Sequence, residues 1–471
     1  KISLNEKHSI TFLNISQFFG VINDNFFKYL IVFLFIDIKG IENAASILTW
    51  VGTVYVLPFL FFSSAAGVLA DRLSKQKMIV FLKFTEVIIM ALGVVAFIFQ
   101  SDWASYFLLF LLSMQSALYG PPKYSIIPEL VSRSKIPKAN GLITSFTYFG
   151  IIGGTFLASF LTQITNKNFP LAAAFGTLMA IIGFVASLFI PETESRHSDR
   201  KINPFFIYEI YSTLKLARKT PSLLPSIFGS ASFLFIGAYF QLNIIPYAVE
   251  SLGYSEVIGG YLFLITAVGI ASGSLLAGKI CKNFPEIGLG CISGLILALI
   301  VFAIGIFHNF HFLVFFGLFA LGAFGGLYIV PFDSFIQRFA TDKKRGQIVA
   351  SSNFLSFCGV LLAPALLYIF SNLLKLTAAG GFIISSGIIM IFVLSITKKL
   401  SNYFFSYLSK IITRLRYESN IENSPFELHI PVILNISRIK KIYIMILSAS
   451  CETLLFYIVK DKKRLHHSFI S

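Results

Sequence analysis

Long apolar stretches recur along most of the chain, and polar residues gather in the short segments between them. Each stretch holds about 20 residues, the length that an α-helix needs to cross the roughly 30 Å hydrocarbon core of a bilayer. The pattern predicts membrane-spanning helices over residues 11–36, 46–70, 78–99, 104–122, 141–163, 169–190, 226–249, 257–280, 287–307, 310–332, 346–371 and 377–397. We therefore expect an all-α integral membrane protein with twelve transmembrane helices.

A charged, proline-containing stretch from Pro191 to Pro225 divides these helices into two sets of six. No apolar window survives within it, so it is expected to be a loop. The sequence predicts an N-terminal six-helix bundle over residues 1–190, a cytoplasmic inter-bundle loop over 191–225, a C-terminal six-helix bundle over 226–397 and a basic cytoplasmic tail over 398–471. Two such halves joined by a long loop are typical of transporters that bind substrate between their repeats, although a channel or a structural membrane protein can also have twelve helices.

Lys and Arg are distributed unequally between alternate loops. Basic loops resist translocation and stay on the cytoplasmic side. One set of loops, from the loop at Arg72 to the loop at Arg345, carries eighteen basic residues, whereas the other set carries three, which are Lys39, Lys167 and Lys375. This asymmetry predicts that both termini and the central loop are cytoplasmic.

The composition agrees with a lipid environment. Charged residues make up 13% of the chain, about half the roughly 25% of an ordinary soluble domain. This argues against a soluble enzyme, a disordered scaffold and a nucleic-acid binder, and the net charge of +16 is accounted for by the basic inner loops. The four cysteines have neither the spacing of a metal site nor that of a disulfide framework, so we expect buried thiols, no metal and no cofactor.

The loop after the second predicted span contains Gly67, Asp71, Arg72 and Lys75. An ordinary positive-inside loop explains the basic residues but not the glycine and the aspartate at this spacing. The pattern resembles the signature of the major facilitator superfamily, in which the glycine allows close helix approach and the charges form a network at the cytoplasmic end. The resemblance implies a gate made of these four residues. The corresponding segment of the second half, residues 273–279, lacks the acid, so the gate is expected to be asymmetric.

The first predicted span carries Asn23, Asp24, Asn25 and Lys28 at membrane depth. An ionised side chain there costs about 2.5–3.5 kcal/mol on insertion scales, so such residues usually face a cavity and have partners. Asp24 and Lys28 lie four residues apart and can pair with each other. The alternative is that Asp24 and the flanking amides line a polar substrate site.

Lys123 follows Pro121 and Pro122 at the end of the fourth span. The prolines predict a break in the helix, and lipid would not tolerate the exposed backbone. Lys123 then offers a compact positive charge suited to a phosphate, or else it snorkels to the interface. In the seventh span, the amides of Gln241 and Asn243 must bond across helices or to a ligand.

Three segments of the first half, residues 23–26, 120–129 and 139–142, together resemble the lysophospholipid transporter branch of the superfamily. In the second half, residues 237–243, 273–279, 326–331 and 345–355 are similar to the transporter part of fused proteins in which the transporter precedes a glycerophospholipid acyltransferase. The similarity covers residues 11–397. It implies a flippase that carries lysophospholipid, typically lysophosphatidylethanolamine, across the inner membrane of a Gram-negative bacterium by alternating access for re-acylation. It also implies a substrate path lined by Asp24, Asn25, Lys28, Lys123, Gln241 and Asn243.

Two departures from the family pattern change the expectations. Thr144 stands where the family has Glu, which weakens the polar network of the fifth span. Residues 421–461 are similar to the opening of the fused acyltransferase domain, but Ile436 and Lys441 replace the His and Asp that the reaction needs. We therefore expect a transporter rather than an enzyme, with a decayed acyltransferase remnant or an unrelated basic tail.

The expected partners are the lysophospholipid substrate, membrane lipid and a separate acyltransferase in the cytoplasm, with no nucleic acid, and the protein is expected to be a monomer. Two rival functions stay open. One is a small-molecule or drug transporter of the same fold, because fold does not fix substrate. The other is a membrane acyltransferase, which the replaced His and Asp argue against.

Overall fold

The computed structural model describes residues 6–40, 43–194, 206–254, 256–281 and 284–416. These residues form long helices joined by short turns. The first half contains α1 (Glu6–Lys39), α2 (Ala44–Arg72), α3 (Lys75–Ile98), α4 (Asp102–Ser125), α6 (Ile136–Ile164) and α7 (Phe169–Leu188). A short helix α5 (Ile127–Leu130) and a 3-10 turn η2 (Arg133–Lys135) connect α4 to α6.

The second half repeats this arrangement of six long helices. They are α9 (Leu223–Pro246), α10 (Glu256–Ile280), α11 (Ile287–Ile306), α12 (His311–Phe339), α13 (Arg345–Tyr368) and α14 (Ala378–Lys399), with π-helical turns η3 (Tyr247–Ser251) and η4 (Ile369–Leu373) extending α9 and α13. Each of the twelve predicted spans thus coincides, to within a few residues, with one long helix.

Eleven helices of the described chain are long and apolar enough to cross a membrane. Among the twelve long helices of the two bundles, α4 lies outside this set, and its second half holds Gln115, Ser116 and the stretch from Gly120 to Lys123. These residues lower its mean hydropathy, yet α4 is 24 residues long and packs against α2 and α3. It is therefore an integral part of the first bundle.

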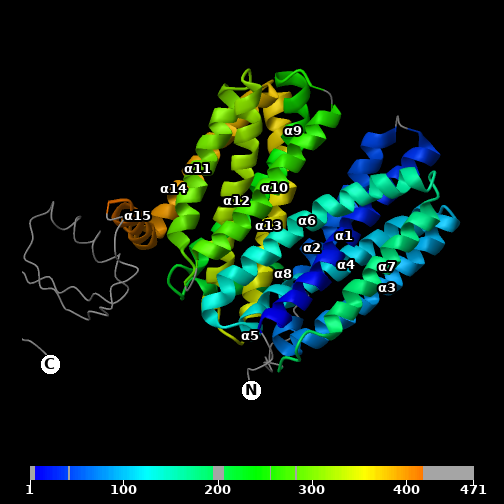
Figure 1. Ribbon diagram of the computed structural model, residues 1–471, viewed down its shortest axis with the longest axis horizontal. Helices are drawn as coiled ribbons and strands as arrows, with labels where there is room; N and C mark the ends of the chain where they lie inside the picture. Colours follow the sequence, from blue (N-terminus) through cyan, green and yellow to red (C-terminus); the bar gives the residue numbers. More distant parts are fainter. Residues whose placement is uncertain (1–5, 41–42, 195–205, 255, 282–283, 417–471) are drawn as a thin grey trace, which may run out of the picture.

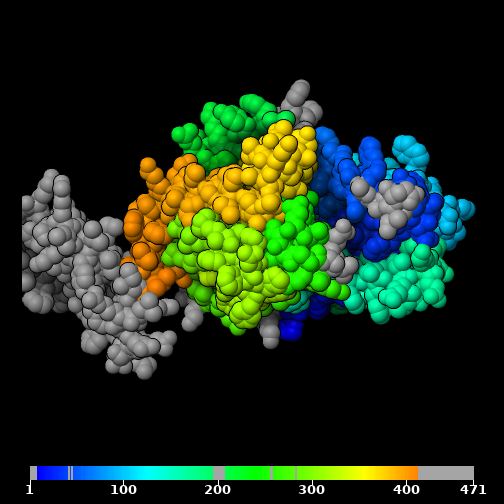
Figure 2. Space-filling view, turned by 90° about the horizontal axis from the view of Figure 1, so that it is seen from above, coloured from blue at the N-terminus to red at the C-terminus, as the bar shows by residue number. Residues whose placement is uncertain are grey.

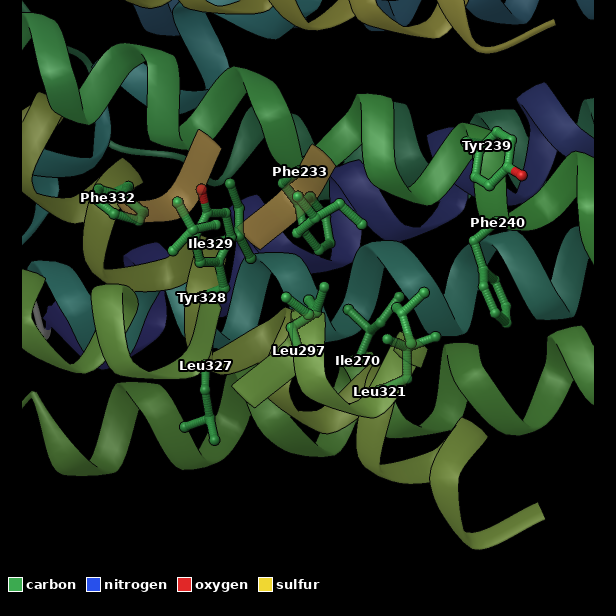
Figure 3. Packing of buried hydrophobic residues seen from close by; sticks show 14 of the residues in the cluster. Phe233, Tyr239, Phe240, Ile270, Leu297, Leu321, Leu327, Tyr328, Ile329 and Phe332 are labelled. Carbon is green, nitrogen blue, oxygen red and sulfur yellow. The ribbon is translucent and has the colours of Figure 1, made fainter. Parts of the chain in front are cut away.

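Apolar packing holds each bundle together. Figure 3 shows this in the second half, where Tyr328 and Phe332 of α12 and Phe233 of α9 belong to one buried apolar cluster. Many large apolar side chains point outward, including Phe81, Trp103 and Phe312, which are largely exposed. A surface this apolar suits lipid rather than water.

Two local expectations were wrong. A helix, α8 (Phe206–Ala217), lies within the predicted inter-bundle loop. A further helix, α15 (Ser401–Arg416), begins the predicted tail, for which no secondary structure was predicted. Both are too short to produce a membrane-length apolar window. The predicted break at Pro121 and Pro122 does not occur, because α4 continues through both prolines to Ser125. Membrane helices tolerate proline where neighbouring groups satisfy the freed backbone carbonyls.

The two bundles lie side by side and approach each other most closely at one end (Figure 1). This end carries the turns at Arg72, Arg133 and Arg345, and we call it the basic end. Contacts between the halves join α2 to α13, α4 to α13, and α6 to both α10 and α12. Figure 2 shows α15 on the side of the second bundle that faces away from the first.

Candidate functional site

A buried polar cluster lies between α1, α3 and α4 in the first bundle. One of its members is Asp24, which is only 8% exposed. The hydroxyl of Ser116 on α4 donates to the carboxylate of Asp24 at 2.7 Å. A buried charge needs such partners, because its desolvation is costly.

Lys28 does not neutralise Asp24 by direct pairing. The two residues form no ion pair within the described helices, so the interpretation of a self-satisfied pair is wrong. Lys28 instead donates from Nζ to Oδ1 of Asn25 at 3.2 Å and lies over the rings of Tyr29 and Tyr55. The carboxylate of Asp24 can therefore accept further hydrogen bonds in addition to the one from Ser116.

An ion pair on α3 that lies near Asp24 was not predicted from the sequence. Nζ of Lys83 donates to Oε2 of Glu86 at 2.7 Å, and both side chains are 1% exposed. Asn23 donates to Oε1 of Glu86 at 3.0 Å, and Gln115 donates to Oε2 at 3.4 Å. The signal was present, because two opposite charges three residues apart interrupt an apolar span.

The ion pair and Asp24 belong to one connected network. The single proton of the Ser116 hydroxyl can go either to Asp24 or to Oε1 of Gln115, which lies 3.2 Å away and whose Nε2 donates to Glu86. Glu86 and Lys83 are also within electrostatic reach of Asp24, so a change of charge at one end affects the other.

Lys123 is 8% exposed, so its side chain is enclosed by protein. Its Nζ lies 4.5 Å from the centre of the Tyr124 ring. In the part of the chain that the structure describes, it has no ion-pair or hydrogen-bond partner. The ammonium is within electrostatic reach of the carboxylates of Asp24 in the first half and Asp333 in the second.

A cavity between the bundles adjoins this region. Its lining includes Tyr124, Thr144 and Tyr148 from the first half and Ser230, Phe233 and Asp333 from the second. Thr144, which replaces the family Glu, thus faces a polar space between the halves. Asp333 was not singled out by the sequence reasoning, because nothing along the chain indicates that it meets α4.

Gln241 and Asn243 lie elsewhere. Asn243 is buried and donates from Nδ2 to the carbonyl of Ala378 at 2.9 Å, which joins α9 to α14. Gln241 is exposed on α9. Neither lines the cavity between the bundles, so their role in binding substrate stays a prediction.

The predicted gate residues lie at the basic end, where Asp71 and Gly67 reach across to the second half. The carboxylate of Asp71 is fully buried and accepts from the backbone N–H groups of Gly346 at 2.7 Å and Gln347 at 3.0 Å. It therefore caps the N-terminus of α13 from outside. A Cβ at Gly67 would lie 2.6 Å from Cβ of Ala350, so α2 and α13 meet there almost backbone to backbone.

The two basic members of the predicted gate do not cross between the halves. Lys75 pairs with Glu129 at 2.8 Å and joins α3 to α5 inside the first half. Arg72 is exposed. Of the four predicted gate residues, Asp71 and Gly67 are thus the ones that the structure places against α13.

Other contacts close the same end. Asn140 of α6 donates to Ser334 and exchanges hydrogen bonds with Gln337 of α12 at 3.0 and 2.9 Å. A Cβ at Gly141 would lie 2.5 Å from the carbonyl oxygen of Ser274. Gln347 also donates to Glu209 of α8 at 3.1 Å. The two halves are therefore joined at the basic end by a dense set of buried contacts.

Comparison with known proteins agrees with this arrangement. The sequence model described as Major Facilitator Superfamily matches residues 13–364. The human organic anion transporter MFSD10 shares the fold, with a TM-score of 0.68 and 14% identity over 84% of this chain and 100% of that one. A bacterial homologue of the iron transporter ferroportin, in an outward-facing state, has a TM-score of 0.64 and 12% identity over 85% of this chain and 99% of that one.

The chain is also similar in sequence to named proteins of one branch of the superfamily. The lysophospholipid transporter LplT of Photorhabdus laumondii is 25% identical over 295 residues, which are 60% of this chain and 69% of the relative. The protein of the same name from Pectobacterium carotovorum is 23% identical over 330 residues, 69% of this chain and 76% of the relative. These relatives confirm the predicted resemblance to this branch, while the closer likeness to the fused proteins stays a prediction. Since the family match spans most of a chain that folds as two bundles of membrane helices, the protein belongs to the major facilitator superfamily.

Proposed function

We propose that this protein is a lysophospholipid transporter that moves lysophosphatidylethanolamine across the inner membrane of a Gram-negative bacterium for re-acylation. The observation that carries the proposal is the pair of buried opposite charges, Asp24 and Lys123, which are near each other but not bonded. Buried charges left without a direct counterion in a membrane transporter mark a substrate path. The names of the relatives support the class of substrate.

The head group of lysophosphatidylethanolamine matches these charges. Its ammonium would meet the carboxylate of Asp24, and its phosphate would meet the ammonium of Lys123. Charge-assisted hydrogen bonds of this kind are about twice as strong as neutral ones. The single acyl chain would follow the apolar helix faces or the surrounding lipid.

Transport would proceed by alternating access. With both termini in the cytoplasm, as the basic loops predict, the basic end is the cytoplasmic end and the closed contacts at Asp71, Asn140 and Gly141 block it. Opening this end requires that the hydrogen bonds between Asp71 and α13 break and that α10 separate from α6. The gate thus lies away from the head-group site, and a separate cytoplasmic acyltransferase would use the delivered lipid.

The test is uptake of labelled lipids by vesicles that contain the purified protein. If Asp24 meets the ammonium, Asp24→Asn should weaken uptake of zwitterionic lysophosphatidylethanolamine far more than that of anionic lysophosphatidylglycerol, which has no ammonium. Lys123→Ala should weaken both, because both lipids carry the phosphate. A lost charge-assisted bond is worth about 1.5–3 kcal/mol, or roughly tenfold to hundredfold in affinity.

The matched control is Asp37→Asn, which removes an exposed carboxylate that pairs with Lys167 at the other end of α1. It should leave both uptakes unchanged. Equal losses for the two lipids in Asp24→Asn would remove the ammonium assignment. Absence of uptake of any lysophospholipid by the unmodified protein, together with transport of soluble compounds, would favour a small-molecule transporter.

A further inference from the structure

Asp333 is a partly buried acid of the second half that the proposed head-group site does not use. It lies on α12, and its Oδ1 accepts from the hydroxyl of Ser230 on α9 at 2.6 Å. Among the residues that the structure describes, this is its one hydrogen bond. A carboxylate has about four acceptor positions, so most of the capacity of Asp333 is directed at the cavity between the bundles.

The surroundings of Asp333 suit an organic cation. The cavity brings the rings of Tyr124 and Tyr148 from the first half to the same space as Asp333 and Phe233 from the second. The rings of Tyr148 and Phe233 meet edge to face, with centroids 6.4 Å apart. A carboxylate beside aromatic rings is the combination that binds ammonium groups, because the ring faces attract cations as well.

The nearest cation of the first half is Lys123. It is within electrostatic reach of Asp333, yet the two form no ion pair in the described chain. The two residues therefore present a positive and a negative charge on opposite halves, and the cavity is lined by Asp333 and by Tyr124, the neighbour of Lys123 in the sequence. A zwitterion placed there can satisfy both at once, with its phosphate on Lys123 and its ammonium on Asp333.

We propose that Asp333 is a second acceptor for the ammonium of the transported head group, and that the head group bridges the two halves through Asp333 and Lys123. This rests on the proposed function and deepens it. Asp24 and Lys123 both belong to the first half, so a head group held by them alone makes no charged contact with the second. Asp333 supplies that contact, and it links recognition of a zwitterion to the relative movement of the bundles.

The proposal is tested by the ratio of lysophosphatidylethanolamine uptake to lysophosphatidylglycerol uptake in vesicles. Asp333→Asn keeps the shape and the Ser230 bond but removes the charge, and the ratio should fall about tenfold or more, as expected for one lost charge-assisted bond. Asp333→Glu keeps the charge and should keep most of the preference. Asp37→Asn serves again as the control, and thermal unfolding of each purified variant shows whether folding is intact.

Three outcomes would overturn the proposal. If Asp333→Asn reduces both uptakes equally while the unmodified protein transports both lipids, Asp333 does not bind the ammonium. The proposed function would still stand. If the unmodified protein requires Na⁺ and Asp333→Asn abolishes that requirement without changing the lipid ratio, the site holds an inorganic cation. If the unmodified protein transports no lysophospholipid, the proposed function fails and this inference fails with it.

Discussion

Asp71, at the end of α2, holds the backbone N–H of Gly346, at the start of α13, with a hydrogen bond of 2.7 Å that joins the two halves of the protein. The carboxylate occupies the place of a helix cap, although it belongs to the other bundle. Because the N-terminus of a helix carries a partial positive charge, the bond stabilises α13 only while the basic end is closed. Opening that end therefore costs the energy of a lost cap.

Asp71→Asn should shift the protein toward the state in which the basic end is open. The substitution removes the negative charge at the N-terminus of α13, which is worth about 0.3–2 kcal/mol and corresponds to a roughly twofold to thirtyfold change in the population ratio. Spin labels or fluorophores on α2 and α13 would report the change in distance. Arg72→Gln, an exposed neighbour in the same turn, should leave the distance unchanged. If Asp71→Asn abolished lipid binding but left the fraction of molecules with a closed basic end unchanged, the assignment of a gate would be wrong.

Gly141→Ala should interfere with closure at the contact between α6 and α10. The added methyl group would lie 2.5 Å from the carbonyl oxygen of Ser274, and overpacking of this kind typically costs about 1–3 kcal/mol. Lipid uptake should fall accordingly. Gly153→Ala is the matched control on the same helix, because its nearest neighbour is 3.8 Å away. Equal effects at both positions would point to a general loss of α6 packing.

Glu86→Gln should destabilise the first bundle by leaving Lys83 buried without its counterion. Breaking one member of a buried pair costs about 3–5 kcal/mol, so the purified variant should unfold at a clearly lower temperature. Replacing Lys83 by Met in the same chain should restore much of the stability, since no unpaired charge is then left. A double variant no more stable than Glu86→Gln would show that the carboxylate is needed for its bonds to Asn23 and Gln115 rather than for the charge.

Truncation after Arg416 should leave transport intact, whereas truncation after Lys399 should not. The sequence alone suggests that everything after the last span is dispensable. However, Tyr403 and Tyr407 of α15 pack against Gly288 of α11, and Lys410 pairs with Glu286 at 2.9 Å. Exposing the face of α11 that α15 covers should lower the free energy of unfolding by about 2 kcal/mol. Thermal stability and uptake of the two truncated chains would decide between these expectations, and equal behaviour would show that α15 does not contribute.

The long helices could be predicted because each needs only one apolar window of membrane length. The short helices α8 and α15 could not, since an amphipathic helix of this length gives no such window. The site was predicted in part. Asp24 and Lys123 are conspicuous as polar residues in apolar surroundings, but the partner of Asp71 lies 275 residues away, and only the packing of the two bundles brings it there. Asp333 is hidden from sequence reasoning for the same reason.

The close backbone contacts at Gly67 and Gly141 also have an electrical consequence. A bacterial inner membrane stores about 2.3 kcal/mol per elementary charge for each 100 mV across it, and any file of water through a transporter would dissipate that energy as a leak of protons. Water needs a polar space of at least its own size. Where helices meet without intervening side chains, no such space is left, so the glycines that let the halves meet would also keep water and protons from passing through this end of the protein.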